Sequence, residues 1–247
     1  MASTSEQMEA SAATVDNTSV TSLIDVNGRS SAPTQSLPQT TTSQSAEYRH
    51  RLAEIVSRAN LEDPLNIVFQ QEKTGRATVV TPDLLYTGAA RRIETKLAAG
   101  ASVVEAANFA AVACWEPPSS NPPPFTEAQF EEMARERPVF AQFVRDIQDT
   151  RLACLGPGQP YWTLSLMARD PNRKDKGAVR AVIEPYINRA KEDKVPLWLV
   201  AGNPRARDVY GYFGFRVVKV IWSYPRDRKE GDEGVPTWCM VCNWPVE

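Results

Sequence analysis

The chain has 247 residues, of which 42% are hydrophobic, so it is long and apolar enough to build a globular core. No run of 18 apolar residues occurs, which argues against a membrane-spanning helix, and the acid-containing N-terminus does not fit a signal or transit peptide. The net charge is −2, with −3 carried by residues 1–46 and +1 by the rest, which argues against a general nucleic-acid-binding surface.

Residues 1–46 are rich in Ser, Thr, Gln and Ala and contain no aromatic residue. Such a segment cannot bury enough apolar area to offset the entropy of ordering it. We therefore expect a disordered tail over residues 1–46 and one folded domain over residues 47–247.

The first part of this domain is predicted to be helical. Apolar residues at helical spacing predict a helix over residues 48–60, and residues 65–71 form a short helix or a turn. Pro82, at a first helical position, begins a longer helix that stops at Gly100. Residues 102–105 and 109–115 then have the pattern of two strands joined by a turn.

Residues 117–158 form an insertion. Five prolines make its beginning a loop, and residues 130–147 have helical spacing with a break near Pro138. Its aromatic residues either line an acceptor pocket or belong to a core; they are Phe125, Phe130, Phe140 and Phe143.

Strands and helices alternate in the last third of the chain. The predicted strands cover residues 161–168, 195–201, 215–222 and 237–243, and the predicted helices cover residues 177–190 and 204–213. This alternation predicts a mixed α/β sheet.

The connection between the first strand and helix of this series is unusually basic. Five basic residues surround it: Arg169, Arg173, Lys174, Lys176 and Arg180. Positive side chains at a helix N-terminus oppose the helix dipole, whereas the free N–H groups there favour phosphate. The pattern indicates either a pyrophosphate site or a solvated loop.

The order of these elements resembles the GNAT N-acetyltransferase family. Residues 162–171 are similar to its fourth strand, and residues 174–179 take the place of its Q/R-x-x-G-x-G/A motif. The segment from Asn203 through Ala206 and Tyr210 to Phe215 is similar to its N-x-x-A-x-x-x-Y…GF pattern. The resemblance is strong over residues 161–220 and implies a GNAT-type acyl-CoA acyltransferase fold with the insertion between the third and fourth strands.

The resemblance also implies a binding mode for acetyl-CoA. Backbone groups of Leu166, Met167 and Ala168 would pair with the pantetheine arm, which Asn203 would also touch. Arg173 and Lys174 would be charge partners of the pyrophosphate, and backbone amides would hold it. These amides belong to Asp175, Lys176, Gly177, Ala178 and Val179.

Catalytic roles are carried over in the same way. Tyr210 is placed to protonate the departing thiolate, or it is an aromatic residue packed between helix and sheet. For the general base, Glu105 and Glu116 are candidates, and deprotonation through ordered water is the alternative. Val179 stands where the family has Gly or Ala; in an alternative register Ala178 takes that place and Lys176 replaces the first glycine.

We expect an enzyme that transfers acetyl from acetyl-CoA to a primary amine on a small molecule, by direct attack in a ternary complex. The alternative is a weak or inactive CoA-binding or interaction module. We expect no metal, nucleic-acid or membrane partner, and the sequence does not set the oligomeric state.

Cys239 and Cys242 form a CxxC in a predicted strand, which favours packed, reduced thiols and a cytosolic or nuclear protein.

Overall fold

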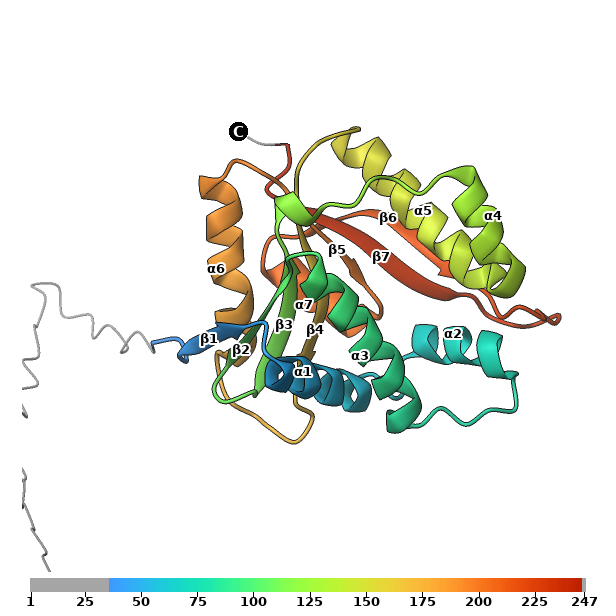
Figure 1. The fold of residues 1–247 in the computed structure, drawn as a ribbon, viewed down its shortest axis with the longest axis horizontal. Helices are drawn as coiled ribbons and strands as arrows, with labels where there is room; N and C mark the ends of the chain where they lie inside the picture. Colours follow the sequence, from blue (N-terminus) through green and yellow to red (C-terminus); the bar gives the residue numbers. More distant parts are fainter. Residues whose placement is uncertain (1–35, 246–247) are drawn as a thin grey trace, which may run out of the picture. The chain divides into compact units, whose positions relative to one another are not determined.

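The computed structural model describes residues 36–245, and the prediction for residues 1–35 lies outside this range (Figure 1). The strands are β1 (Thr40–Ser43), β2 (Ser102–Ala106), β3 (Ala111–Glu116), β4 (Trp162–Arg169), β5 (Leu197–Ala201), β6 (Arg216–Ser223) and β7 (Val235–Cys242). The helices are α1 (Ala46–Ala59), α2 (Pro64–Thr74), α3 (Pro82–Ala98), α4 (Glu127–Glu136), α5 (Pro138–Leu155), α6 (Ala178–Glu192) and α7 (Pro204–Tyr212), with a 3-10 turn at Pro118–Ser120.

The strands form one mixed sheet in the order β1-β2-β3-β4-β5-β7-β6. Neighbouring strands are antiparallel except β4 and β5, which are parallel. The predicted α/β class and mixed sheet are therefore confirmed, and the elements predicted from residue 47 onward are present. Helices α4 and α5 form the insertion between β3 and β4.

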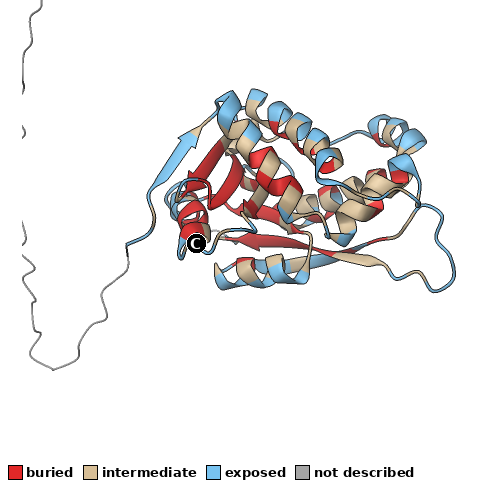
Figure 2. Ribbon diagram, turned by 90° about the horizontal axis from the view of Figure 1, so that it is seen from below, coloured by how far each residue is buried: buried red, intermediate tan, exposed pale blue. Residues whose placement is uncertain are grey.

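Helices cover both faces of the sheet, which is why its central strands are buried along their length (Figure 2). On one face, α6 packs its residues Val182 and Ile183 against Ala113 and Trp115 of β3. On the other face, α1 and α3 contribute Leu52 and Ile93 to a second core, which also contains alternate residues of β3. Helix α5 covers β5, β6 and β7.

Strand β1 corrects the expected boundary of the tail. Residues 40–43 read Thr-Thr-Thr-Ser and were expected to be disordered, yet Thr40 pairs with Ala106 and Ser43 with Val103. The strand is short, polar and exposed, as suits the edge of a sheet. The strand is stabilised by main-chain pairing with β2. Such pairing cannot be predicted from the spacing of hydrophobic residues.

No helix within residues 36–245 is long and apolar enough to cross a membrane.

The turn between β2 and β3 depends on Glu105. Ala107, Asn108 and Phe109 all have positive φ, between 51° and 61°, which is unusual for residues other than glycine. The Glu105 side chain is buried and accepts a 2.7 Å hydrogen bond from the Phe109 amide. It also accepts one from the Thr41 hydroxyl, so it connects the turn to β1.

Replacing Glu105 is expected to destabilise the fold. Glu105→Ala leaves the Phe109 amide without its partner and should lower the free energy of unfolding by about 1–3 kcal/mol. Chemical denaturation measures this change, with Glu132→Gln in an exposed ion pair as the control. Equal stability of Glu105→Ala and the control would show that the turn does not need the carboxylate.

Candidate functional site

The parallel pairing of β4 and β5 stops partway along both strands. Residues 162–164 pair with residues 197–199, but β4 continues to Arg169 and β5 to Ala201 without further pairing between them. On its outer side β4 stays paired with β3 to its end, and β5 stays paired with β7. The two strands therefore diverge and leave β4 main-chain groups without a β5 partner.

Strand β4 also carries a bulge at the point where the strands separate. Cys114 pairs with Leu166 and Trp115 with Leu164, so Ser165 is an extra residue in β4. The Ser165 hydroxyl donates to the Cys114 carbonyl. Bulges bend a strand and redirect its groups, and they are common beside active sites.

A cavity of about 620 Å³ lies at this opening. Residues 164–167 of β4, residues 200–203 at the end of β5, and side chains of α1, α2, α3 and α7 line it. We call this cavity the cleft. Its volume lies within the range of small-molecule sites.

The structure places the predicted pantetheine-binding residues at or beside the cleft. Leu166 and Met167 line it, whereas Ala168 is buried in the core beneath α1. All three lie beyond the last residue of β4 that pairs with β5. Of the four aromatic residues of the insertion, Phe140 lines the cleft and Phe130 is buried.

The start of α6 has the features of an anion site. Gly177 is the N-cap in a left-handed conformation with φ of 78°, and no side chain among the described residues caps the helix. Lys174 and Lys176 are exposed beside it. Ala178 is buried, and Val179 is half-buried against the core under α6. The first amides of α6 are therefore available to an anion.

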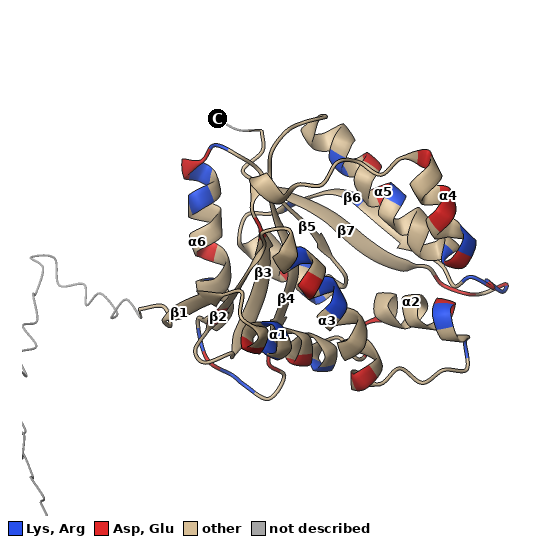
Figure 3. Cartoon of the chain, viewed as in Figure 1, with Lys and Arg blue, Asp and Glu red and all other residues tan. Residues whose placement is uncertain are grey.

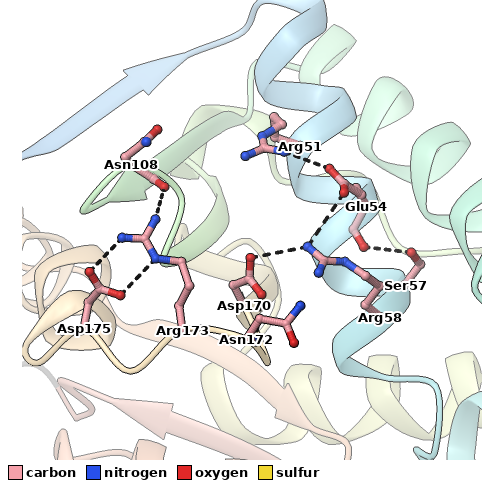
Figure 4. A network of polar contacts seen from close by, with 9 residues as sticks. All are labelled: Arg51, Glu54, Ser57, Arg58, Asn108, Asp170, Asn172, Arg173 and Asp175. Carbon is pink, nitrogen blue, oxygen red and sulfur yellow. Dashed lines mark hydrogen bonds and ion pairs between the residues drawn. The ribbon is translucent and has the colours of Figure 1, made fainter.

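Arg173 is already engaged by the protein (Figure 4). Its guanidinium donates to both oxygens of Asp175, at 3.0 and 2.7 Å, and to the Asn108 carbonyl at 2.6 Å. The hydrogen bonds with Asp175 raise the pKa of Arg173 and lower that of Asp175. In this arrangement Arg173 holds the loop against the β2–β3 turn. Within the part of the chain that the structure describes, Lys174 and Lys176 beside Gly177 form no ion pair.

A second contact covers the same glycine. A Cβ atom at Gly177 would lie 3.1 Å from Cδ of Pro38 and 3.6 Å from Cδ2 of Leu37. The segment before β1 thus packs against the N-cap of α6. A larger residue at position 177 would meet this segment in addition to its strained φ.

Tyr210 lines the cleft from α7 and is buried. Burial raises the pKa of its hydroxyl above the usual value for tyrosine. Its ring also packs edge-on against Phe215, with centroids 6.0 Å apart. The phenol is therefore a neutral proton donor at a wall of the cleft, and it also contributes to packing.

Asn203 connects α7 to a carboxylate that the sequence did not single out. The Asn203 side chain accepts from the Ala206 amide at 2.9 Å, which caps α7, and donates to Oδ2 of Asp63 at 3.1 Å. Oδ1 of Asp63 accepts from the amides of Leu65 and Asn66 at the start of α2. Because Oδ2 has a further lone pair, Asp63 can accept one more hydrogen bond or a proton.

Neither predicted base lies on the cleft wall. Glu105 is held in the β2–β3 turn, and Glu116 forms an ion pair with Lys96 at 2.6 Å. Asp63 is the carboxylate that lines the cleft in the described part of the chain. In the sequence, Asp63-Pro64 indicated only a break between two helical segments. Its contact with residues 200–203 could not be predicted, because these residues are far from Asp63 along the chain.

No protein-family model matches the chain. Putative increased recombination centers protein 11 of Saccharomyces cerevisiae is 32% identical over 80 residues, which are 32% of this chain and 51% of that protein. An uncharacterized N-acetyltransferase of Schizosaccharomyces pombe is 24% identical over 124 residues, 46% of this chain and 50% of that protein. The chain thus spans about half the length of the curated relatives it matches.

Solved structures of acetyltransferases are similar over most of the domain. Arylalkylamine N-acetyltransferase 2 from Aedes aegypti has a TM-score of 0.55 at 15% identity, covering 82% of this chain and 97% of that one. A mosquito arylalkylamine N-acetyltransferase like 5b has a TM-score of 0.54 at 11% identity, covering 82% and 99%. The resemblance seen in the sequence is confirmed at the level of the fold: the chain has the GNAT acyl-CoA acyltransferase fold.

Proposed function

We propose that the protein transfers the acetyl group of acetyl-CoA to a primary amine in a ternary complex. The observation that carries this proposal is the divergence of β4 from β5, which exposes β4 main-chain groups along the cleft. The fold similarity to acetyltransferases supports the same reaction class.

The residues present fit acetyl-CoA. Main-chain groups of Leu166 and Met167 are free to pair with its pantetheine arm, and a β4 N–H can polarise the thioester carbonyl. The uncapped amides of α6, with Lys174 and Lys176, are suited to its diphosphate. When bound, acetyl-CoA supplies the thioester whose carbonyl carbon the amine attacks.

Asp63 is suited to receive the proton of the acceptor. An ammonium group must lose a proton before its nitrogen can attack, and a carboxylate within reach can take that proton directly or through water. Asp63 lies beside the end of β5, and the amides of α2 and the Asn203 side chain fix its orientation. We therefore assign it the role of general base.

Tyr210 is suited to donate a proton to the leaving thiolate of CoA. Collapse of the tetrahedral intermediate breaks the carbon–sulfur bond and leaves a thiolate that needs a proton. A tyrosine hydroxyl carries its proton at neutral pH, and Tyr210 lines the cleft where the thiolate forms in this proposal. The nitrogen loses two protons in the reaction. Asp63 takes the first before the attack and later releases it to water, and the second replaces the proton that Tyr210 gives to the thiolate.

A second candidate function is a CoA-binding module with little or no turnover. It is favoured by the positions of the two predicted bases away from the cleft, Glu105 in the β2–β3 turn and Glu116 in its ion pair with Lys96. This candidate predicts that acetyl-CoA raises the melting temperature while no amine releases free thiol.

Calorimetric titration with acetyl-CoA tests the proposal. We expect one binding site and a stabilisation of about 2.7 kcal/mol when the ligand concentration is about 100 times Kd. A Lys174→Gln/Lys176→Gln variant should bind more weakly, whereas Arg135→Gln, in an exposed ion pair on α4, should bind like the wild type. The absence of both heat and a thermal shift with the wild type would refute the proposal.

Tyr210→Phe should lower kcat by about 10²-fold or more, the usual contribution of a general acid, and leave acetyl-CoA affinity unchanged. Because the pKa of Tyr210 is raised, the wild type should not lose activity through its ionisation below about pH 10. Tyr86→Phe, outside the cleft and bonded to His50, is the control for steady-state kinetics. Unchanged turnover of Tyr210→Phe would limit this hydroxyl to packing.

Asp63→Asn should keep the cap of α2 and lower kcat/KM at pH 7 by about 10²-fold. The defect should shrink as the pH approaches the pKa of the acceptor, because the amine is then neutral before it binds. A pH profile of kcat/KM measures this, with the exposed Asp208→Asn as the matched control. A defect that is independent of pH would argue against proton transfer to Asp63.

A further inference from the structure

One wall of the cleft is strongly cationic. Figure 3 shows basic residues on α3 and at the end of α2. Five basic side chains from α2, α3 and the residue before α5 line the cleft: Lys73, Arg91, Arg92, Lys96 and Arg137. They come from segments that are separate in the sequence. We call this set the cationic wall.

The protein neutralises only part of this charge. Lys96 pairs with Glu116. Glu72 has a fully buried side chain, and its Oε2 lies 3.6 Å from Nε of Arg137. Within residues 36–245, Lys73, Arg91 and Arg92 form no ion pair, and all three are accessible to solvent.

Glu72 also accepts hydrogen bonds from the main chain of α5. Its oxygens accept from the amides of Val139 at 2.6 Å and Phe140 at 3.3 Å, so it caps the start of α5. The contact with Arg137 is too long for a hydrogen bond, and Nε of Arg137 is buried without a hydrogen-bond partner in residues 36–245. The Arg137 guanidinium instead stacks 4.0 Å above the ring of Phe140. Arg137 is thus held in place with hydrogen-bonding capacity left over.

Electrostatics at the wall favour an added anion. Desolvation, followed by repulsion from Arg137 and Arg91, lowers the pKa of Lys73. Desolvation also lowers the pKa of Arg137, an effect that attraction from Glu72 opposes and repulsion from Arg91 reinforces. A ligand anion would offset the desolvation cost by its attraction to these cations and would reduce their mutual repulsion.

The cationic wall is separate from the predicted diphosphate site. The cleft is lined by residues 164–167 and by residues 200–203, but by none of residues 168–199, which include the loop before α6. The wall therefore belongs to the side of the cleft formed by α2, α3 and α5. It is available to the acceptor.

A negative charge lies at the start of α2, the end of the helix that is remote from the cationic wall. Asp63 caps the start of this helix beside Gly202, and Lys73 lies in its last turn. Ten residues separate them, which is about 15 Å along a helix axis. The cleft thus has a carboxylate near the strand opening and cations farther along the same helix.

From this arrangement we infer that the acceptor is a primary amine that carries an anionic group, a carboxylate or a phosphate. The ammonium end binds at Asp63, and the anionic group binds at Lys73, Arg91 and Arg137. This inference rests on the proposed acetyltransferase function and specifies its substrate class.

Matched acceptors test the inference. ω-Amino carboxylates from β-alanine to 8-aminooctanoate are compared with alkylamines of equal length, and O-phosphoethanolamine with ethanolamine, by thiol release from acetyl-CoA. We expect kcat/KM to be about tenfold or more higher for the anionic member of a pair, the gain typical of a charge-assisted hydrogen bond. The carboxylate and phosphate series show which anion the wall prefers. Equal or better use of the neutral amines would overturn the inference and leave the acetyltransferase proposal standing.

A Lys73→Gln/Arg91→Gln variant tests the wall itself. Both side chains are exposed and form no ion pair with another described residue, so the variant should fold. It should raise KM for the anionic acceptors and leave unchanged both kcat/KM for neutral amines and the affinity for acetyl-CoA. The preference for anionic over neutral acceptors should therefore disappear. Arg135→Gln should keep the preference. If the double variant keeps it, or if its acetyl-CoA affinity falls, the wall does not bind the acceptor.

A measurement without turnover separates the two proposals. Glutarate and inorganic phosphate, at constant ionic strength set with chloride, should raise the melting temperature of the wild type but not of the double variant. If no amine releases thiol while this difference persists, the acetyltransferase proposal fails and the anion site stands. Identical responses of the two proteins would overturn the anion site whether or not acetyl transfer occurs.

Discussion

The site depends on one constraint, the separation of two parallel strands that are paired only at their beginnings. A strand without its partner leaves main-chain N–H and C=O groups unsatisfied, and burying such groups is costly. Here β4 stays paired with β3 and β5 with β7 to the ends of the strands, so most of their outer main-chain groups are satisfied. The bulge at Ser165 adds a bend to β4, and α6 and α1 hold it from opposite faces.

The elements around this opening are fixed by polar contacts between distant parts of the chain. Asp63 joins the start of α2 to Asn203 at the start of α7, across the end of β5. Glu105 joins β1 to the β2–β3 turn, and Arg173 joins that turn to the loop before α6. These contacts align the predicted diphosphate site, the strand opening and the cleft along β4.

Much of the site could be anticipated because its residues are close in sequence. The strand, glycine and helix over residues 162–192, and the segment from Asn203 to Phe215, carry their geometry in local patterns, and Tyr210 lies on the cleft as its position in that segment indicated. Asp63 and the cationic wall could not be found in this way. They join residues that are separated by tens of positions, and no sequence period links them.

The sequence by itself determined the succession of helices and strands and the α/β class, because apolar spacing, prolines and glycines act within a few residues. Only the tertiary structure decided that residues 40–43 form an edge strand, since their polar sequence gains its stability from β2. It also decided the role of each charge. Arg173 became a structural contact and Asp63 a cleft residue, because the effect of a charge depends on the partners that the fold brings within hydrogen-bonding distance.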